Sequence, residues 1–188
     1  SQGRKEGVIL KFDESLQVGN YSSLTFDNYM NNLIKPFRQN RISKSKELSG
    51  HLETAIGLLR GFAHGTLSSS QVFDVELMGR FLAVSSVWGA WHPMRWHNIR
   101  LYYNPITARL EPVAYDGSLH YFKRKSVEPS HDPFFASLLE TDLGVRPFYE
   151  AALRKLKREA EEGITEKWVS SIQTRDLNIL RKEYPLLA

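Results

Sequence analysis

The stretch WGAWHPMRWHNIRLYYNPITARLEPVAYDGS (88–118) decides the fold. It holds two β-rich runs, IRLYY and RLEPVAY, joined by NPITA, whose Asn-Pro pair is typical of a turn. The sequence therefore predicts an antiparallel strand pair over 99–115, which would bring Asn98 and Asp116 to its open end. Pro112 has no amide hydrogen to donate, so we expect the second strand to be bulged or to lie at a sheet edge.

Helical periodicity flanks this stretch on both sides. Upstream, apolar residues at steps of three or four predict one helix over 46–65 and a second from the serines at 68–70 to Val87. Downstream, the same spacing predicts three helices, within 132–140, 146–163 and 165–184. The expected fold class is α+β and mostly helical, with a small antiparallel hairpin.

The first 47 residues carry weaker signals. A short β-rich run over 7–14 predicts a strand, and 26–37 predicts a short helix that Pro36 stops. Residues 38–47 are polar and basic, which indicates a loop.

Composition narrows the class of protein. The chain has 188 residues, which is near the size of one domain, and we expect 1–188 to form a single domain. No apolar run approaches the roughly 20 residues of a membrane span. There is no cysteine, which excludes disulfides and thiolate zinc sites and leaves the compartment open. The net charge of +4 is small and spread along the chain, so nucleic-acid binding is not indicated.

The order of elements around the hairpin indicates a chemistry. A long helix, a loop ending in Asn, a strand pair and then Asp-Gly form the layout of the catalytic face in a protein kinase C-terminal lobe. In that mechanism the loop Asn and the Asp after the strand pair hold magnesium against nucleotide phosphates. Asn98 and Asp116 supply hard oxygen ligands of the kind that magnesium prefers.

The same residues carry a family resemblance. WHPMRWHN, RLYYNP and EPVAYDGS resemble the loop, strand and closing motif of the CotH kinase family, the spore-coat-protein-H-like atypical protein kinases. The resemblance is strongest over about 70–120. It matches Asn98 and Asp116 to the two magnesium positions. The catalytic Asp of the family falls on His92, and the second acid of the closing motif falls on Ser118.

The resemblance implies an activity. A member of this family would transfer the γ-phosphoryl group of ATP, with Mg²⁺ or Mn²⁺, to a protein hydroxyl. His92 would accept the hydroxyl proton in place of the usual Asp. The family also implies a bacterial coat or envelope protein as substrate, and hence a spore coat or cell envelope location.

A kinase has an N-terminal lobe that this sequence does not display. No Gly-rich loop and no strand bearing the nucleotide lysine precede residue 48, and the sequence begins with Ser rather than Met. We therefore interpret the chain as the C-terminal lobe of a CotH-like kinase with the N-terminal lobe truncated. In that interpretation 7–14 is the last strand before the hinge between lobes.

Two other functions stay open. The departures at His92 and Ser118 favour a non-catalytic pseudokinase or partner-binding module. A metal-dependent hydrolase would instead use His92, His97, Asp116 and His120 as a cluster of metal ligands. Arg95 and Arg100 flank the loop, where they would neutralise a phosphate or form surface salt bridges.

Overall fold

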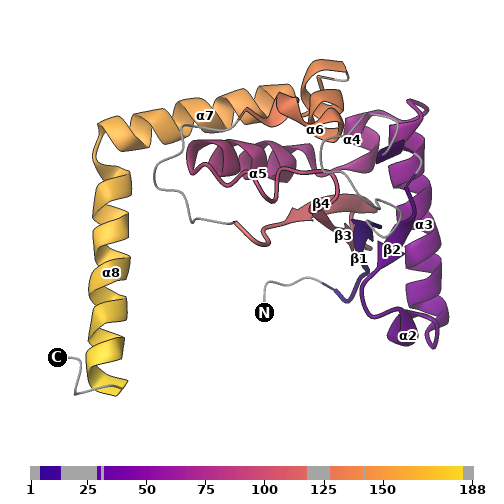
Figure 1. The fold of residues 1–188 in the computed structure, drawn as a ribbon, viewed down its shortest axis with the longest axis horizontal. Coiled ribbons are helices and arrows are strands. Elements are labelled where there is room, and N and C mark those ends of the chain that lie inside the picture. Colours follow the sequence, from indigo (N-terminus) through magenta and orange to yellow (C-terminus); the bar gives the residue numbers. More distant parts are fainter. Residues whose placement is uncertain (1–4, 14–28, 31, 118–127, 142, 184–188) are drawn as a thin grey trace, which may run out of the picture. The chain divides into compact units, whose positions relative to one another are not determined.

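The computed structural model describes residues 5–13, 29–30, 32–117, 128–141 and 143–183. Its elements along the chain are β1 (Ile9–Phe12), β2 (Ile34–Pro36), α2 (Gln39–Ile42), α3 (Lys46–Ala63), α4 (Ser69–Val72), α5 (Val75–Val87), β3 (Arg100–Asn104), β4 (Arg109–Val113), the 3-10 turn η1 (Pro129–His131), α6 (Pro133–Ala136), the π-helical turn η2 (Ser137–Thr141), α7 (Arg146–Glu161) and α8 (Ile164–Glu183) (Figure 1). The predicted α+β, mostly helical class is confirmed.

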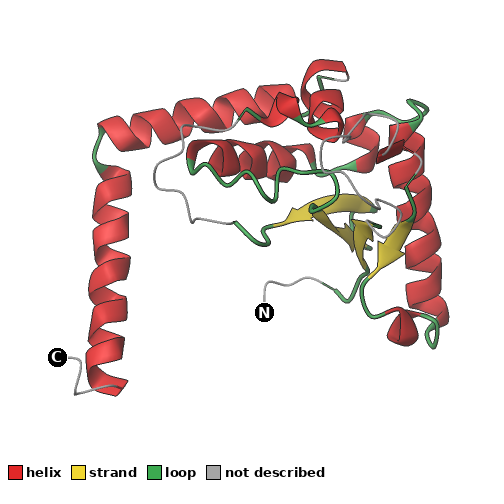
Figure 2. Cartoon of the chain, viewed as in Figure 1, coloured by secondary structure: helices red, strands yellow, loops and turns green. Residues whose placement is uncertain are grey.

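The four strands form one antiparallel sheet in the order β2-β1-β3-β4. Figure 2 shows these strands gathered in one place with helices beside them. The predicted strand pair over 99–115 is confirmed as β3 and β4, in register from Arg100 opposite Val113 to Asn104 opposite Arg109. Pro112 lies in β4, which is an edge strand as expected.

One face of the sheet packs into the hydrophobic core. Leu10 and Phe12 of β1 and Leu101 of β3 are buried on that face, because side chains alternate between faces along a strand. Helices α3 and α5 add further buried side chains to this core: Leu48, Ala55, Leu59, Phe62 and Ala63 from α3, and Met78, Leu82 and Ala83 from α5. The other face is mixed, because it carries Lys11, Lys35 and Arg100 together with Tyr102 and Glu111.

The helix predicted over 26–37 is wrong at its C-terminal end. Residues 34–36 form strand β2, which pairs with β1 so that Ile34 lies opposite Phe12 and Lys35 opposite Lys11. Ile34 is buried whereas Lys35 is exposed, which is strand alternation. Residues 26–28 and 31 of that predicted helix lie outside the described residues.

Two other sequence predictions need correction. The loop predicted over 38–47 contains the short helix α2, and Ser45 caps α3 by accepting a hydrogen bond from the Leu48 amide. The helix predicted from 68–70 to Val87 is two helices, because Phe73 is extended and bridges to Leu110 of β4. The Asp74 carboxylate then caps α5 through the Leu77 amide. A tertiary contact therefore interrupts a continuous helical pattern.

The three predicted C-terminal helices are present as α6 with η2, α7 and α8. The chain separates into two compact units, 1–152 and 153–188. All the buried hydrophobic core residues of the described chain lie in the first unit. The last of them along the chain is Val145, just before α7 begins at Arg146. No helix in the described part of the chain is both long and apolar enough to cross a lipid bilayer.

Candidate functional site

The open end of the β3–β4 hairpin brings His92, Asn98 and Asp116 together. His92 Nδ1 lies 2.8 Å from Asp116 Oδ2, and Asn98 Nδ2 donates a 3.2 Å hydrogen bond to the backbone oxygen of His92. His92 therefore contacts both predicted magnesium ligands. The juxtaposition expected of Asn98 and Asp116 arises because the strands between them pair in register.

The loop between α5 and β3 holds these side chains through a buried anchor. Trp96 is fully buried, and its ring meets Phe12 of β1 edge-to-face with centroids 5.6 Å apart. The Trp96 amide donates a 3.0 Å hydrogen bond to Asp132 Oδ2. The amides of Asn98 and Ile99 both donate to the Arg95 oxygen, which closes the turn into β3. Asn98 is thus fixed by backbone and core contacts on both sides.

Asp132 anchors the loop of the candidate site and was not among the residues predicted from the sequence. Its carboxylate accepts hydrogen bonds from the Trp96 amide and from the Phe134 amide of α6. Burial raises the pKa of Asp132 to about 6, against the lowering effects of these backbone donors and of the Arg95 charge. Asp132 before Pro133 is a recognisable helix start, but its contact with Trp96 is long-range and leaves no local pattern.

Asp116 occupies an uncommon backbone conformation. Its φ is 49°, in the left-handed region, which Asp tolerates better than most residues do. The preceding strand β4 ends at Val113, and Asp116 follows in the irregular segment 114–117. The Asp116 side chain is 41% exposed and that of His92 is 34% exposed, so both are open to a solute.

The oxygen donors fit magnesium, which in nucleotide sites takes one or two protein ligands with substrate phosphates and water. Asp116 has a second carboxylate oxygen beyond the one that faces His92. Asn98 Oδ1 accepts a 3.3 Å hydrogen bond from Arg100 Nη2, so this contact must give way before the amide oxygen meets a cation. Both predicted ligands thus contact His92, and the oxygen of one of them, Asn98, accepts a hydrogen bond from the Arg100 guanidinium.

Of the four metal ligands predicted for a hydrolase, His92 and Asp116 are in contact in the described residues. His120 lies outside the described residues. The His97 ring is buried and packs edge-to-face on Trp96. Over the part of the chain that the structure describes, no group of three or more His, Cys, Asp or Glu residues is placed to share a metal ion.

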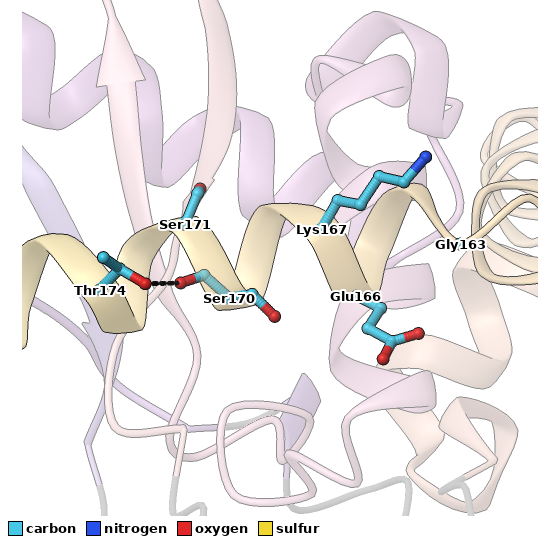
Figure 3. A pocket seen from close by; sticks show the side chains of 6 residues that line it. All are labelled: Gly163, Glu166, Lys167, Ser170, Ser171 and Thr174. Carbon is cyan, nitrogen blue, oxygen red and sulfur yellow. Dashed lines mark hydrogen bonds between the residues drawn. The ribbon is translucent and has the colours of Figure 1, made fainter.

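A shallow hollow lies along helix α8, away from the hairpin. Figure 3 shows that the residues lining it come from this helix and the glycine before it: Gly163, Glu166, Lys167, Ser170, Ser171 and Thr174. The Thr174 hydroxyl donates a hydrogen bond to the Ser170 backbone oxygen. The charged ends of Glu166 and Lys167 point away from each other. A hollow along one helix brings together no groups from different elements, so the hairpin end is the better candidate site.

Comparison of the chain with models of protein families, with curated proteins and with solved structures gives no match in any of the three.

Proposed function

We propose that this chain is the C-terminal lobe of a kinase-like phosphotransferase, which moves the γ-phosphoryl group of ATP to a protein hydroxyl. The contact of His92 Nδ1 with Asp116 Oδ2 at 2.8 Å carries the proposal. In this contact the His92 imidazole, a proton acceptor, meets the Asp116 carboxylate at the end of the hairpin, and the Asn98 amide bonds to the His92 backbone. The resemblance of 70–120 to the CotH kinases supports the same reaction.

The contact assigns a role to each ring nitrogen of His92. With Nδ1 donating its hydrogen to Asp116, the lone pair is on Nε2, which is the nitrogen available to a substrate hydroxyl. As the hydroxyl oxygen bonds to the γ-phosphorus, its proton passes to Nε2 and the bond to the leaving ADP oxygen breaks. Asp116 orients the imidazole and stabilises the imidazolium that forms.

Asn98 and Asp116 would hold the magnesium ion, which would neutralise charge on the phosphates. The bond from Asn98 Nδ2 to the His92 oxygen holds the amide in place, and its Oδ1 would exchange the hydrogen bond from Arg100 for the cation. The family resemblance extends the proposal to a bacterial coat or envelope protein as the phosphate acceptor.

The first experiment measures Mg-ATP binding and ATP turnover in the wild-type chain and three variants, with the upstream lobe included. Asp116→Ala should abolish binding and turnover, because it removes a phosphate-metal ligand and the His92 partner. His92→Ala should leave binding intact and slow turnover by about 10²- to 10⁴-fold, the usual effect of losing a positioned base. His131→Ala, an exposed histidine outside the site, serves as the matched control.

The proposal is wrong if the wild-type protein turns over ATP and His92→Ala and Asp116→Ala leave the rate unchanged. It also fails if Mg-ATP does not bind. In that second case the chain would be a module without nucleotide chemistry.

A non-catalytic partner-binding module is the second candidate. The Asn98 side chain is engaged at both ends within the chain, since Nδ2 bonds to His92 and Oδ1 to Arg100. Thermal unfolding with Mg-ATP separates the two functions. Nucleotide at 100 times its Kd stabilises a binding protein by about 2.7 kcal/mol, whereas a module without a nucleotide site shows no shift.

A further inference from the structure

Arg100 is a buried cation with weak neutral partners. The residue is 9% exposed at the start of β3. Nη1 donates to the backbone oxygens of His97 and Ile99 at 3.4 and 3.2 Å, and Nη2 donates to Asn98 Oδ1 at 3.3 Å. These distances lie at or beyond the long end of the usual range for N–H···O bonds.

The Nε atom of Arg100 is buried and has no hydrogen-bond partner in the described residues. Within those same residues, no carboxylate forms an ion pair with the guanidinium. Burial of a charge without an opposite charge is unfavourable, and a bound anion would offset that cost at Arg100.

Two aromatic rings hold this guanidinium in place. Its central carbon lies 5.5 Å from the ring centroid of Phe37, just after β2, and 5.0 Å from that of Tyr115, just after β4. Both rings are partly open to solvent, at 40% and 51% exposure. Rings over a guanidinium attract its charge through their faces and leave the N–H groups in its plane for other partners.

The unpaired Nε and the weakly bound Nη2 form one edge of the guanidinium. Two parallel N–H groups on an edge match the spacing of two oxygens of a phosphate, which is why arginine binds phosphate in a bidentate manner. Lys11, whose Nζ lies 5.8 Å from the Phe37 ring centroid, adds a second positive charge on the same face of the sheet.

We propose that Arg100, framed by Phe37 and Tyr115, is a phosphate-binding site that takes an oxyanion on its Nε–Nη2 edge. The inference rests on the proposed function, because it assigns the phosphate to the nucleotide bound at the hairpin end. An oxyanion on this edge replaces Asn98 Oδ1 as the acceptor from Nη2, and the Asn98 oxygen is released toward the site. Arg100 therefore couples phosphate binding to the release of the Asn98 side-chain oxygen.

The test measures binding by titration calorimetry without divalent metal, in EDTA, with tripolyphosphate and then with ATP. The wild-type protein should bind both, and Arg100→Gln should weaken each by about 10- to 100-fold, the effect of losing a charge-assisted pair. Arg109→Gln changes the same residue type at the other end of the same hairpin and should bind as the wild type does. Equal affinity of wild-type protein and Arg100→Gln, or absence of tripolyphosphate binding, overturns the inference.

The source of the phosphate is tested with a second ligand. A phosphoserine peptide that binds more tightly than ATP, and loses affinity in Arg100→Gln, would identify a phosphorylated protein rather than a nucleotide and overturn the assignment made here. Tighter binding of ATP supports it.

Two surface variants keep the test decisive if Arg100→Gln fails to fold. Tyr115→Ala and Phe37→Ala remove exposed rings, so both should fold, and each should weaken metal-free tripolyphosphate binding by about 3- to 10-fold through loss of guanidinium orientation. Unchanged binding in both contradicts the inference. Failure of Mg-ATP turnover with retained, Arg100-dependent oxyanion binding would reject the proposed function and leave the phosphate site standing.

Discussion

Asp132 shows how one carboxylate can organise a site far from it along the chain. The residue is 2% exposed, caps α6 through the Phe134 amide and binds the Trp96 amide of the site loop. Burial raises its pKa to about 6, because an ionised carboxylate in the core loses more hydration than the backbone donors of Trp96, Phe134 and Phe135 and the Arg95 charge restore. The residue that positions the loop therefore titrates close to neutral pH.

This titration predicts a pH effect on stability. The pKa of Asp132 in the folded protein, about 6, exceeds the value of about 3.9 for an unfolded Asp, so the folded protein binds more protons between these values. The contribution of Asp132 is therefore most favourable below about pH 4 and falls as the pH rises to about 6, by at most about 1.4 kcal/mol per pH unit.

The side chain of the Asp132→Asn variant cannot ionise, so its free energy of unfolding should not show the decrease between pH 4 and pH 6 that Asp132 causes. Urea unfolding at pH 4, 5, 6 and 7 measures the difference from wild-type protein. Glu140→Gln, an exposed carboxylate on η2, should keep the wild-type profile. Parallel profiles for wild-type protein and Asp132→Asn would show that the raised pKa is wrong.

Part of the candidate site could be predicted from local sequence. Asn98 and Asp116 flank a strand pair, and pairing in register brings the segments that carry them to the same end of the hairpin whatever surrounds it. The environment of Arg100 could not be predicted, since Phe37 and Tyr115 follow the two edge strands β2 and β4, and only sheet assembly brings them to β3. The surface salt bridge considered for Arg100 is wrong, because the side chain is buried.

At the level of the elements, helices approach each other closely at one glycine. A Cβ atom at Gly79 of α5 would lie 2.6 Å from the Tyr149 nitrogen and 2.7 Å from the Phe148 Cβ of α7. Real Cβ contacts are not this short, and one of the partners is backbone, so the helices would have to separate. In contrast, a Cβ atom at Gly50 of α3 would have no neighbour within 4 Å.

These two glycines predict opposite effects of the same substitution. Gly79→Ala should destabilise the protein by about 1–3 kcal/mol through overpacking between α5 and α7. Gly50→Ala should stabilise it by about 0.5–1 kcal/mol, because Ala has the higher helix propensity and meets no obstacle. Urea unfolding of both variants checks the pair. A gain in stability for Gly79→Ala would show that the two helices do not touch there.

Tertiary contacts override local apolar spacing at two of the element boundaries. The apolar spacing from 68 to 87 is helical throughout, yet Phe73 leaves the helix to bridge Leu110. The gain is burial of the Phe73 ring against Phe62, with ring centroids 5.1 Å apart. Ile34 likewise contributes more as part of a strand opposite Phe12 than as part of a solvated helix.

Within the first unit, one aromatic cluster joins elements from near its start to near its end. Phe134 of α6 lies at its centre, with ring centroids within 6.0 Å of five other rings, those of Phe12, Tyr29, Phe62, Phe73 and Phe135. The cluster connects β1, α3, the junction of α4 with α5, and α6. These elements unfold together because none buries its apolar side alone.

Phe134→Ala should therefore be among the most damaging single changes, with a loss of about 3–5 kcal/mol in the free energy of unfolding. Phe37→Ala removes the same side chain from a position with 40% exposure and should cost at most about 1 kcal/mol. Thermal and urea unfolding measure both. A similar loss in the two variants would mean that the aromatic cluster is not the centre of the core.

The sequence by itself determined the α+β class, the helical character of α3, α5, α7 and α8, and the β3–β4 hairpin. These depend on residue spacing and turn chemistry, which act over a few residues. Only the tertiary structure decided the strand role of 34–36, the break at Phe73, the anchor at Asp132 and the buried position of Arg100. Each of these depends on burial against segments distant along the chain, and burial energy is absent from any local pattern.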